Sequence, residues 1–204
     1  RASDYQAFAR SRAAILNAVR NHLPQSSPLP ELDGPWITYD DPVQQFRAVL
    51  EMIGGRCLRV PDAAAIEAAL AELPEYATAA KTLSLIPGVG HTNVELETID
   101  NPHDLEDIDF AILPGEFAVA ENAAVWVTDT GLKHRVVYFL CQHLSLVVPA
   151  DQVVNNLAEA YQRIRFDGPG FGGFIAGPSK TADIEQSLVI GAHGPKSMTV
   201  FLVG

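Results

Sequence analysis

The sequence predicts an α/β fold in which a mostly parallel sheet is flanked by helices. Segments with helical periodicity alternate with short apolar segments, which is the order typical of α/β proteins. Some of the short segments, such as residues 136–140 and 144–148, are almost continuously apolar, as expected for strands covered on both faces. The 204 residues, 48% of them hydrophobic, suffice for one domain with a substantial core.

The N-terminal segment predicts a helix followed by a linker. Residues 4–22 carry apolar side chains at helical spacing, and Asp4 can cap the helix. Four prolines follow between residues 24 and 35, where little periodicity is left. We therefore expect residues 1–34 to form a helical arm and a proline-rich linker, and residues 35–204 to form the main domain. The helix either packs on its own domain or holds a partner subunit.

The middle of the chain predicts two helices and a series of strands. Helices are expected at 42–53, which stops at Gly54-Gly55, and at 62–73, on either side of a strand at 57–60. Further strands are expected at 82–86, 110–113, 117–120, 125–128, 136–140 and 144–148.

The last third predicts one longer helix and a strand–loop–helix unit. Asp151 is expected to cap a helix that runs to Ile164. After a glycine-rich loop, a strand at 174–176 is expected to lead into a short helix at 181–186. Two more strands, at 188–190 and 199–202, are expected to finish the sheet.

The charge and the apolar runs limit the partners of the chain. The formal net charge is −11 and no cluster of Lys and Arg reverses it locally, so nucleic acid is not an expected partner. No apolar run reaches the roughly 20 residues that span a bilayer. No signal peptide is apparent, although the chain does not begin with Met, and a cytoplasmic location is expected.

The two cysteines, Cys57 and Cys141, are expected to be buried thiols. An iron–sulfur cluster normally takes about four thiolates, so no cluster is expected on this chain. None of the six histidines stands in a spacing typical of a zinc site, and no metal is expected. No G-x-G-x-x-G opens a helix, so a dinucleotide cofactor is not expected either.

The densest group of polar residues follows the strand expected at 174–176. Its members are Gly177, Ser179, Lys180, Thr181, Asp183 and Glu185. The end of a strand before a helix is where open α/β sheets bind ligands. Ser179 or Thr181 could instead cap the helix while the acids complement its dipole. Because a helix needs one cap only, we favour a ligand site for the group.

Two other pairs of neighbouring residues interrupt apolar segments. Glu121 and Asn122 lie between two expected strands, and Glu121 is either a turn residue or an inward carboxylate that serves as general acid or base. His193 and Gly194 lie in a tight loop after a strand. The imidazole could transfer a proton or contact an anion there, and the alternative is a turn histidine that faces solvent.

Residues 177–185 (GPSKTADIE), with 191–195 (GAHGP) after them, resemble the C-terminal signature of the lactate-utilization protein C family, also called the LUD domain. Residues 121–126 (ENAAVW) are similar to an upstream family block. The resemblance covers the chain from about residue 35 to the end. It implies a fold like that of ribose-phosphate isomerases, sugar-phosphate deaminases and CoA transferases.

The resemblance also implies a function and partners. The process would be oxidation of L-lactate to pyruvate, with two iron–sulfur proteins as partners that carry the clusters and a small carboxylate as substrate. Whether the chain forms a homo-oligomer stays open. The candidate catalytic residues are Glu121, Asp183 and His193. The candidate ligand-binding residues are Asn122, Gly177, Ser179, Lys180, Thr181, Glu185 and Gly194.

Two hypotheses follow. In the first, the chain is an accessory subunit of a lactate-oxidising system, and its three polar stretches meet in one cavity. In the second, it is a stand-alone enzyme or a binding module for a sugar phosphate, CoA ester or folate-like molecule, with Glu121 as nucleophile or general base.

Overall fold

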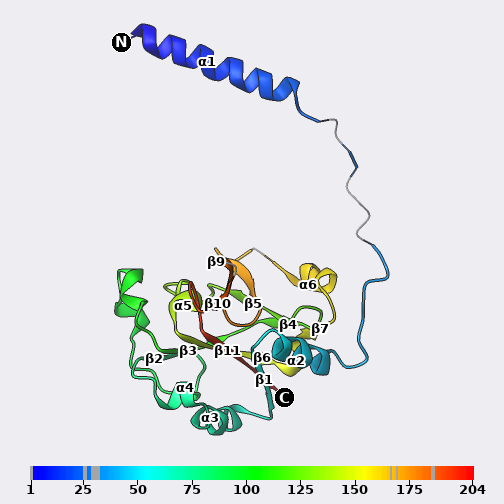
Figure 1. Ribbon diagram of the computed structural model, residues 1–204, viewed down its shortest axis with the longest axis vertical. Helices are drawn as coiled ribbons and strands as arrows, with labels where there is room; N and C mark the ends of the chain where they lie inside the picture. The colour runs from blue at the N-terminus through cyan, green and yellow to red at the C-terminus, as the bar shows by residue number, and fades with distance from the viewer. Residues whose placement is uncertain (1, 25–26, 29–32, 166, 169, 185–186) are drawn as a thin grey trace. The chain divides into compact units, whose positions relative to one another are not determined.

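The structure is a computed structural model that describes residues 2–24, 27–28, 33–165, 167–168, 170–184 and 187–204. The chain separates into two compact units, residues 1–34 and residues 35–204. The first unit contains helix α1 (Ala2–Asn21), so the helix expected near the N-terminus is confirmed (Figure 1). Ile15 and Val19 of this helix are exposed.

The second unit is built on a five-stranded sheet with the order β1-β11-β6-β3-β2. Its strands are β1 (Arg56–Val60), β2 (Thr82–Ser84), β3 (Phe110–Pro114), β6 (His143–Pro149) and β11 (Ser197–Val203). Every pair of neighbours in this sheet is parallel, which confirms the mostly parallel α/β fold. Short 3₁₀ helices, η1 (Leu96–Thr98) and η2 (Pro102–Leu105), lie between β2 and β3 in the chain.

Alternating side chains of β1, β3, β6 and β11 enter two different hydrophobic clusters. In β3, Phe110 and Ile112 face one hydrophobic cluster, whereas Ala111 and Leu113 face another. The strand is therefore buried on both faces, which explains its continuously apolar sequence.

Helices cover one face of the sheet, and helices with a second sheet cover the other (Figure 1). The first face carries α3 (Ala63–Ala71) and α4 (Pro74–Ala77), and the second carries α2 (Pro42–Met52) and α5 (Val137–Leu140). Side-chain caps begin two of these helices: Asp41 accepts from the Gln44 N–H at 2.9 Å, and Asp62 accepts from the Ala65 N–H at 2.9 Å.

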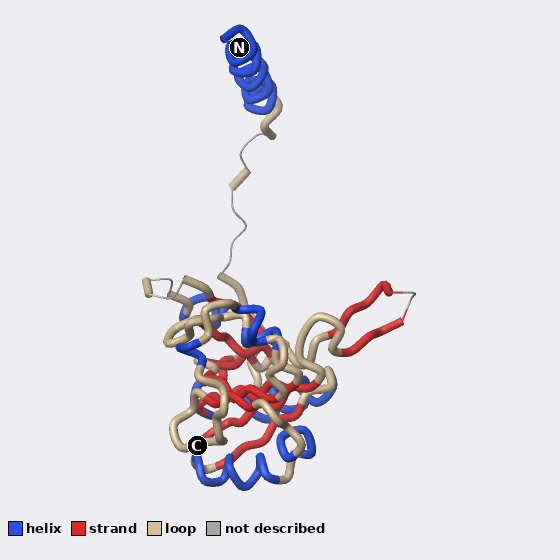
Figure 2. Tube along the Cα trace, turned by 90° about the vertical axis from the view of Figure 1, so that its left-hand side faces the viewer, coloured by secondary structure: helices blue, strands red, loops and turns tan. Residues whose placement is uncertain are grey.

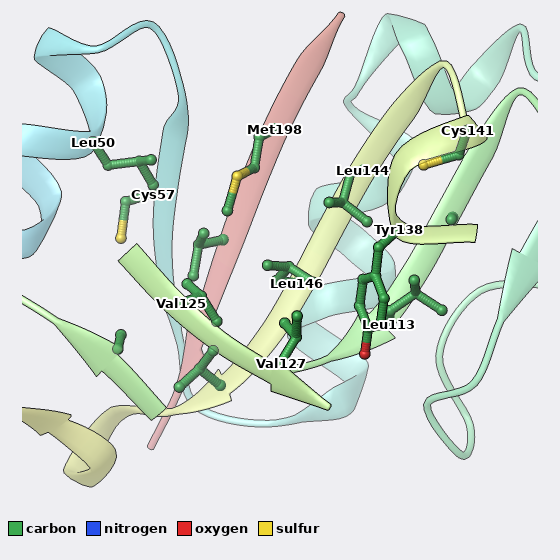
Figure 3. Packing of buried hydrophobic residues seen from close by; sticks show 14 of the residues in the cluster. Leu50, Cys57, Leu113, Val125, Val127, Tyr138, Cys141, Leu144, Leu146 and Met198 are labelled. Carbon is green, nitrogen blue, oxygen red and sulfur yellow. The ribbon is translucent and has the colours of Figure 1, made fainter. Parts of the chain in front are cut away.

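The second sheet has four strands in the order β7-β4-β5-β8. They are β4 (Phe117–Val119), β5 (Ala124–Thr128), β7 (Val153–Val154) and β8 (Gly172–Ile175). Val125 and Val127 of β5 lie in one cluster with Leu144 and Leu146 of β6, between the two sheets (Figure 3). The opposite face of β5 presents Trp126 to a cluster that includes residues of α6 (Leu157–Arg163).

The strand expected at 136–140 is wrong, because these residues enter helix α5. A short apolar run fits a buried helical turn as well as a strand. Here the turn buries Tyr138, whose hydroxyl donates to the carbonyl oxygens of Thr128 at 3.2 Å and Pro114 at 3.3 Å. The helix thereby joins the two sheets.

The helix expected from Asp151 begins six residues later, at Leu157. Residues before it form a 3₁₀ turn, η3 (Ala150–Gln152), and strand β7, which pairs with β4. Asn156 caps α6 instead, since its Oδ1 accepts from the Glu159 N–H at 2.9 Å. The β-branched pair Val153-Val154 favours the strand.

The helix expected at 181–186 is also wrong. Strand β9 (Lys180–Ile184) pairs antiparallel with β10 (Ser187–Ile190), and this hairpin extends from the body of the unit (Figure 2). Residues 188–190 therefore do not join the main sheet, whereas the strand expected at 199–202 does, within β11. Residues 185 and 186 lie outside the described residues.

None of the helices in the described ranges combines the length and the apolar composition that crossing a bilayer requires.

Candidate functional site

The structure brings two of the polar stretches identified in the sequence into contact. The Ser179 N–H donates to the Pro195 carbonyl oxygen at 2.8 Å, and the Gly191 N–H donates to the Ser179 carbonyl oxygen at 2.9 Å. A Cβ built on Gly194 would lie 3.0 Å from the Ser179 Cβ, so the two loops touch closely. Ser179 and Gly194 thus belong to one local structure.

Gly177 holds the first of these loops against α2. Its φ is +70°, a conformation that glycine adopts freely, and a Cβ there would lie 2.9 Å from Ile53 Cδ1. The side chains of Pro178 and Lys180 lie beside Gly54, at the end of α2. The loop is therefore positioned by α2 as well as by residues 191–195.

The other predicted residues of this region lie in or near the hairpin. Lys180 is exposed and pairs with Ile190, and Thr181 is half-buried and pairs with Val189. Asp183 belongs to β9, and Glu185 lies outside the described residues. His193 is exposed in the loop before β11.

Glu121 and Asn122 form the turn between β4 and β5. The Glu121 carboxylate is exposed, and its Oε2 accepts from the Leu157 N–H at 2.9 Å, at the start of α6. Asn122 Oδ1 accepts from the Ala124 N–H at 3.1 Å, and Ala123 between them has a φ of +55°. These contacts favour the turn interpretation, in which Glu121 also caps a helix.

Within the described residues, the hydrogen bonds of the Glu121–Asn122 turn run to residues 124 and 155–157 and none reaches the two loops. The hydrogen bonds thus connect the loop of Ser179 with the loop of Gly194, and the Glu121–Asn122 turn is not part of this connection. The catalytic and binding roles assigned from the sequence stay predictions.

A separate cavity of about 280 Å³ lies at the amino edge of the parallel sheet. Its lining residues come from α4, the turn that follows it, and the starts of three strands: Glu75, Thr78, Ala79, Asp109, Gln142, His143 and Lys196. Asp109 precedes β3, His143 begins β6 and Lys196 precedes β11, so the sheet brings residues from distant parts of the chain together.

The imidazole of His143 lies at the centre of this group. Its Nδ1 is 2.8 Å from the Ser197 hydroxyl, and its ring stacks on Phe110 with 6.3 Å between centroids. Burial lowers the pKa of His143, and nearby Lys196 lowers it further, while Glu75 and Asp109 oppose the shift. The ring is therefore neutral near pH 7.

The two carboxylates of the cavity have different surroundings. Asp109 Oδ2 accepts from the backbone N–H groups of Lys81 at 2.9 Å and Ala80 at 2.8 Å, and the bond from Lys81 is the main cause that lowers the pKa of Asp109. Glu75 Oε2 is buried and has no hydrogen-bond partner among the described residues. The nearest cation is Arg56, whose Nη1 is 3.8 Å away.

No motif in the sequence marks this cavity. Its residues precede or begin strands, or lie in and after a four-residue helix, and each is unremarkable alone. One signal in the sequence could have indicated it, since a polar residue stands directly before each of three apolar strands. These residues are Asp109, Gln142 and Lys196.

Neither the cysteines nor the metal-binding side chains form a redox or metal centre in the described residues. Cys57 and Cys141 are buried free thiols, and burial raises their pKa values to about 11 and about 12. No group of three or more His, Cys, Asp or Glu side chains there is arranged to hold a metal ion.

Comparison with known families gives one match over most of the chain. The model of the LUD domain matches residues 43–203, which include both loops, the Glu121–Asn122 turn and the lining of the cavity.

Curated relatives are similar over about half of the chain. Lactate utilization protein C 1 of Bacillus mycoides (strain KBAB4) is 35% identical over 102 residues, which cover 44% of this chain and 44% of the relative. Lactate utilization protein C of Geobacillus kaustophilus (strain HTA426) is 28% identical over 123 residues, which cover 57% of this chain and 48% of the relative. The matched segment spans less than half the length of these relatives.

Among solved structures, a DUF162 family protein from Deinococcus radiodurans has the same fold. The TM-score is 0.51 at 15% sequence identity, and the match covers 80% of this chain and 96% of that chain. At this identity the likeness concerns the fold alone.

Proposed function

Because this chain belongs to the LUD domain family, we propose that it acts in lactate utilization, as a subunit of a system that oxidises L-lactate to pyruvate. The observation that carries this proposal is the family match over residues 43–203, together with relatives that bear the name lactate utilization protein C.

The oxidation needs an acceptor for electrons. When L-lactate becomes pyruvate, the carbinol carbon loses its hydrogen, the hydroxyl loses its proton and a C=O bond forms, so two electrons and two protons leave. An iron–sulfur cluster takes about four thiolates, and the two cysteines of this chain are buried. We therefore assign the electron acceptors to clusters on two partner proteins and no cofactor to this chain.

The small carboxylate substrate is assigned to the loops that contain Ser179 and His193. Lys180 is exposed beside them, so its ammonium group is accessible to an anion. Lys180 and the Ser179 hydroxyl would bind the carboxylate, and His193 would take the hydroxyl proton.

Reconstitution tests the proposal. Purification of the full chain from the native host shows whether two cysteine-rich proteins accompany it. The chain is then combined with them, and lactate-dependent reduction of an artificial acceptor is measured. We expect activity only when all three proteins are present. Full activity without this chain would contradict the subunit role.

A substitution tests the proposed binding loop. Lys180→Met should raise KM for lactate about tenfold or more, as expected for loss of a charged hydrogen bond of roughly 1.5–3 kcal/mol. Lys81→Met is the matched control, because Lys81 pairs with Asp107 on the surface and exposed pairs contribute little.

The alternative of a stand-alone enzyme for a sugar phosphate, CoA ester or folate-like molecule has less support. It assigns the nucleophile or general base to Glu121, but this carboxylate is exposed and accepts the Leu157 N–H.

A further inference from the structure

The cavity at the amino edge of the sheet carries charges of both signs. Glu75 and Asp109 supply two negative charges, Lys196 supplies one positive charge, and His143 is neutral near pH 7. The lining residues alone sum to a net charge of about −1, and Arg56, 3.8 Å from Glu75, offsets part of it. The presence of both signs in the lining favours a ligand that carries both.

Glu75 has an unused hydrogen-bonding capacity. Its buried Oε2 lacks a hydrogen-bond partner among the described residues, and the guanidinium of Arg56 lies 3.8 Å from it. The Ser145 hydroxyl, two residues beyond His143 on the same face of β6, is also buried without a partner. The Glu75 side chain as a whole is 28% exposed and lines the cavity, so a ligand there can donate a hydrogen bond to its carboxylate.

Lys196 supplies the opposite charge from a fixed position. Its backbone N–H donates to the Gln142 carbonyl oxygen at 2.7 Å, and its methylene chain packs over Gly191. No carboxylate of the described residues lies within ion-pair distance of its ammonium group. The group is therefore free to meet an anionic part of a ligand.

We propose that this cavity binds a small zwitterion of the α-amino acid type, with its ammonium group at Glu75 and Asp109 and its carboxylate at Lys196. Thr78 and Gln142 add neutral hydrogen-bonding groups, and Ala79 offers a small apolar contact for a short side chain. The volume of about 280 Å³ is below the roughly 300–1,000 Å³ typical of pockets for drug-sized molecules, which fits a small ligand.

The same charges select against lactate. L-Lactate and L-alanine share a skeleton, but lactate carries a hydroxyl group where alanine carries an ammonium group. Lactate has no positive group to place against Glu75 and Asp109. The site therefore goes beyond the proposed lactate function and does not depend on it.

Three molecules of similar shape test the proposal. L-Alanine, L-lactate and L-alaninol (a cation without the carboxylate) are titrated into the isotope-labelled full chain, and the backbone amide signals of Thr78, Ala79 and Gln142 are followed by NMR. These local signals separate the cavity from any lactate bound at the Ser179 loop. L-Alanine should shift them saturably, with a dissociation constant at least about tenfold lower than that of either analogue.

Two substitutions should change the selectivity in opposite ways. Glu75→Gln should weaken L-alanine about tenfold and leave L-lactate no weaker than before. Lys196→Met should weaken L-alanine about tenfold and leave L-alaninol unchanged. Glu72→Gln is the matched control, because this exposed residue three positions before Glu75 does not line the cavity and should leave all three affinities unchanged.

The proposal is overturned if L-alanine gives no saturable shift at these amides in the wild-type chain, or if L-lactate binds there as tightly. It is also overturned if the substitutions leave the affinity for L-alanine unchanged. Lys196 is exposed, so we expect Lys196→Met to retain the fold. If Glu75→Gln does not fold, the affinity of Lys196→Met for L-alanine tests the proposal.

Discussion

At the residue scale, Gly194 occupies a position where a methyl group has little room. A Cβ there would lie 3.0 Å from the Cβ and 3.2 Å from the Oγ of Ser179. Ser179 cannot easily move aside, because its N–H and its carbonyl oxygen are both used in hydrogen bonds with the opposing loop. The contact between the loops therefore requires glycine.

Gly194→Ala should lower the free energy of unfolding by about 1–3 kcal/mol, the usual cost of overpacking. Chemical denaturation monitored by circular dichroism measures this. Gly168→Ala is the control, since a Cβ there meets nothing within 4 Å, and its effect should stay within about 0.5 kcal/mol. Equal effects of the two substitutions would show that the loops are not closely packed.

His143 makes stability depend on pH. Burial lowers the pKa of the folded form below the unfolded value of about 6.5, so the unfolded chain binds the proton more readily. The stabilisation by the neutral ring is complete above pH 6.5 and is lost as the pH falls through the lowered pKa. Wild type should thus lose more stability than His143→Gln between pH 7.5 and 5, as measured by their melting temperatures. Parallel losses would contradict the prediction.

At the scale of elements, Asn156 links α6 to the segment before α2. Its Oδ1 caps the helix, and its Nδ2 donates to the Ile37 carbonyl oxygen at 2.8 Å. The neighbouring Asn155 accepts the Tyr39 N–H at 2.9 Å. Two adjacent amides thus attach the entry of the second unit to the second sheet.

Asn156→Ala should cost about 2 kcal/mol of stability, because it removes the cap and leaves the Ile37 carbonyl without its donor. Asn156→Asp should cost less, since a carboxylate keeps the cap. Urea denaturation of both variants checks this order. If Asp were as damaging as Ala, the bond to Ile37 rather than the cap would be the important one.

The sequence predicted the elements with strong local signals and missed those fixed by tertiary contacts. The apolar strands β3, β6 and β11 were predicted, because burial on both faces leaves a continuous apolar run. The segments around Tyr138 and Thr181 were misassigned, since a short run reads equally as helix or strand until its partners are known.

For the candidate sites too, the sequence indicated the local features and missed those that depend on tertiary structure. The contact between Ser179 and Gly194 joins two stretches that the sequence had marked as polar loops. The cavity around His143 could not be predicted, because its lining depends on the order in which parallel strands pair, and β11 inserts between β1 and β6.

At the scale of the whole molecule, every buried hydrophobic residue lies between Phe46 and Leu202 among the residues whose side chains the structure describes, which leave out 1–10 and 182–188. Residues 35–204 alone should therefore melt within a few degrees of the full chain, as measured by circular dichroism. A melting temperature lower by more than about 10 °C would show that α1 packs on the second unit. A change in the sedimentation coefficient with an unchanged melting temperature would show that α1 holds a partner. A kcal/mol of stability corresponds to roughly 2–4 °C at this size.

The position of β11 has a consequence for folding. In its sheet, β1 pairs only with β11, although Arg56 and Thr199 are separated by most of the chain. Strand β1, near the start of the second unit, therefore cannot pair until β11, near the C-terminus, is available. This long separation in sequence raises the contact order and slows folding. Until β11 pairs with them, β1 and β6 expose unpaired backbone N–H and C=O groups that can pair with strands of other molecules, so dilution and low temperature should improve the yield of refolding.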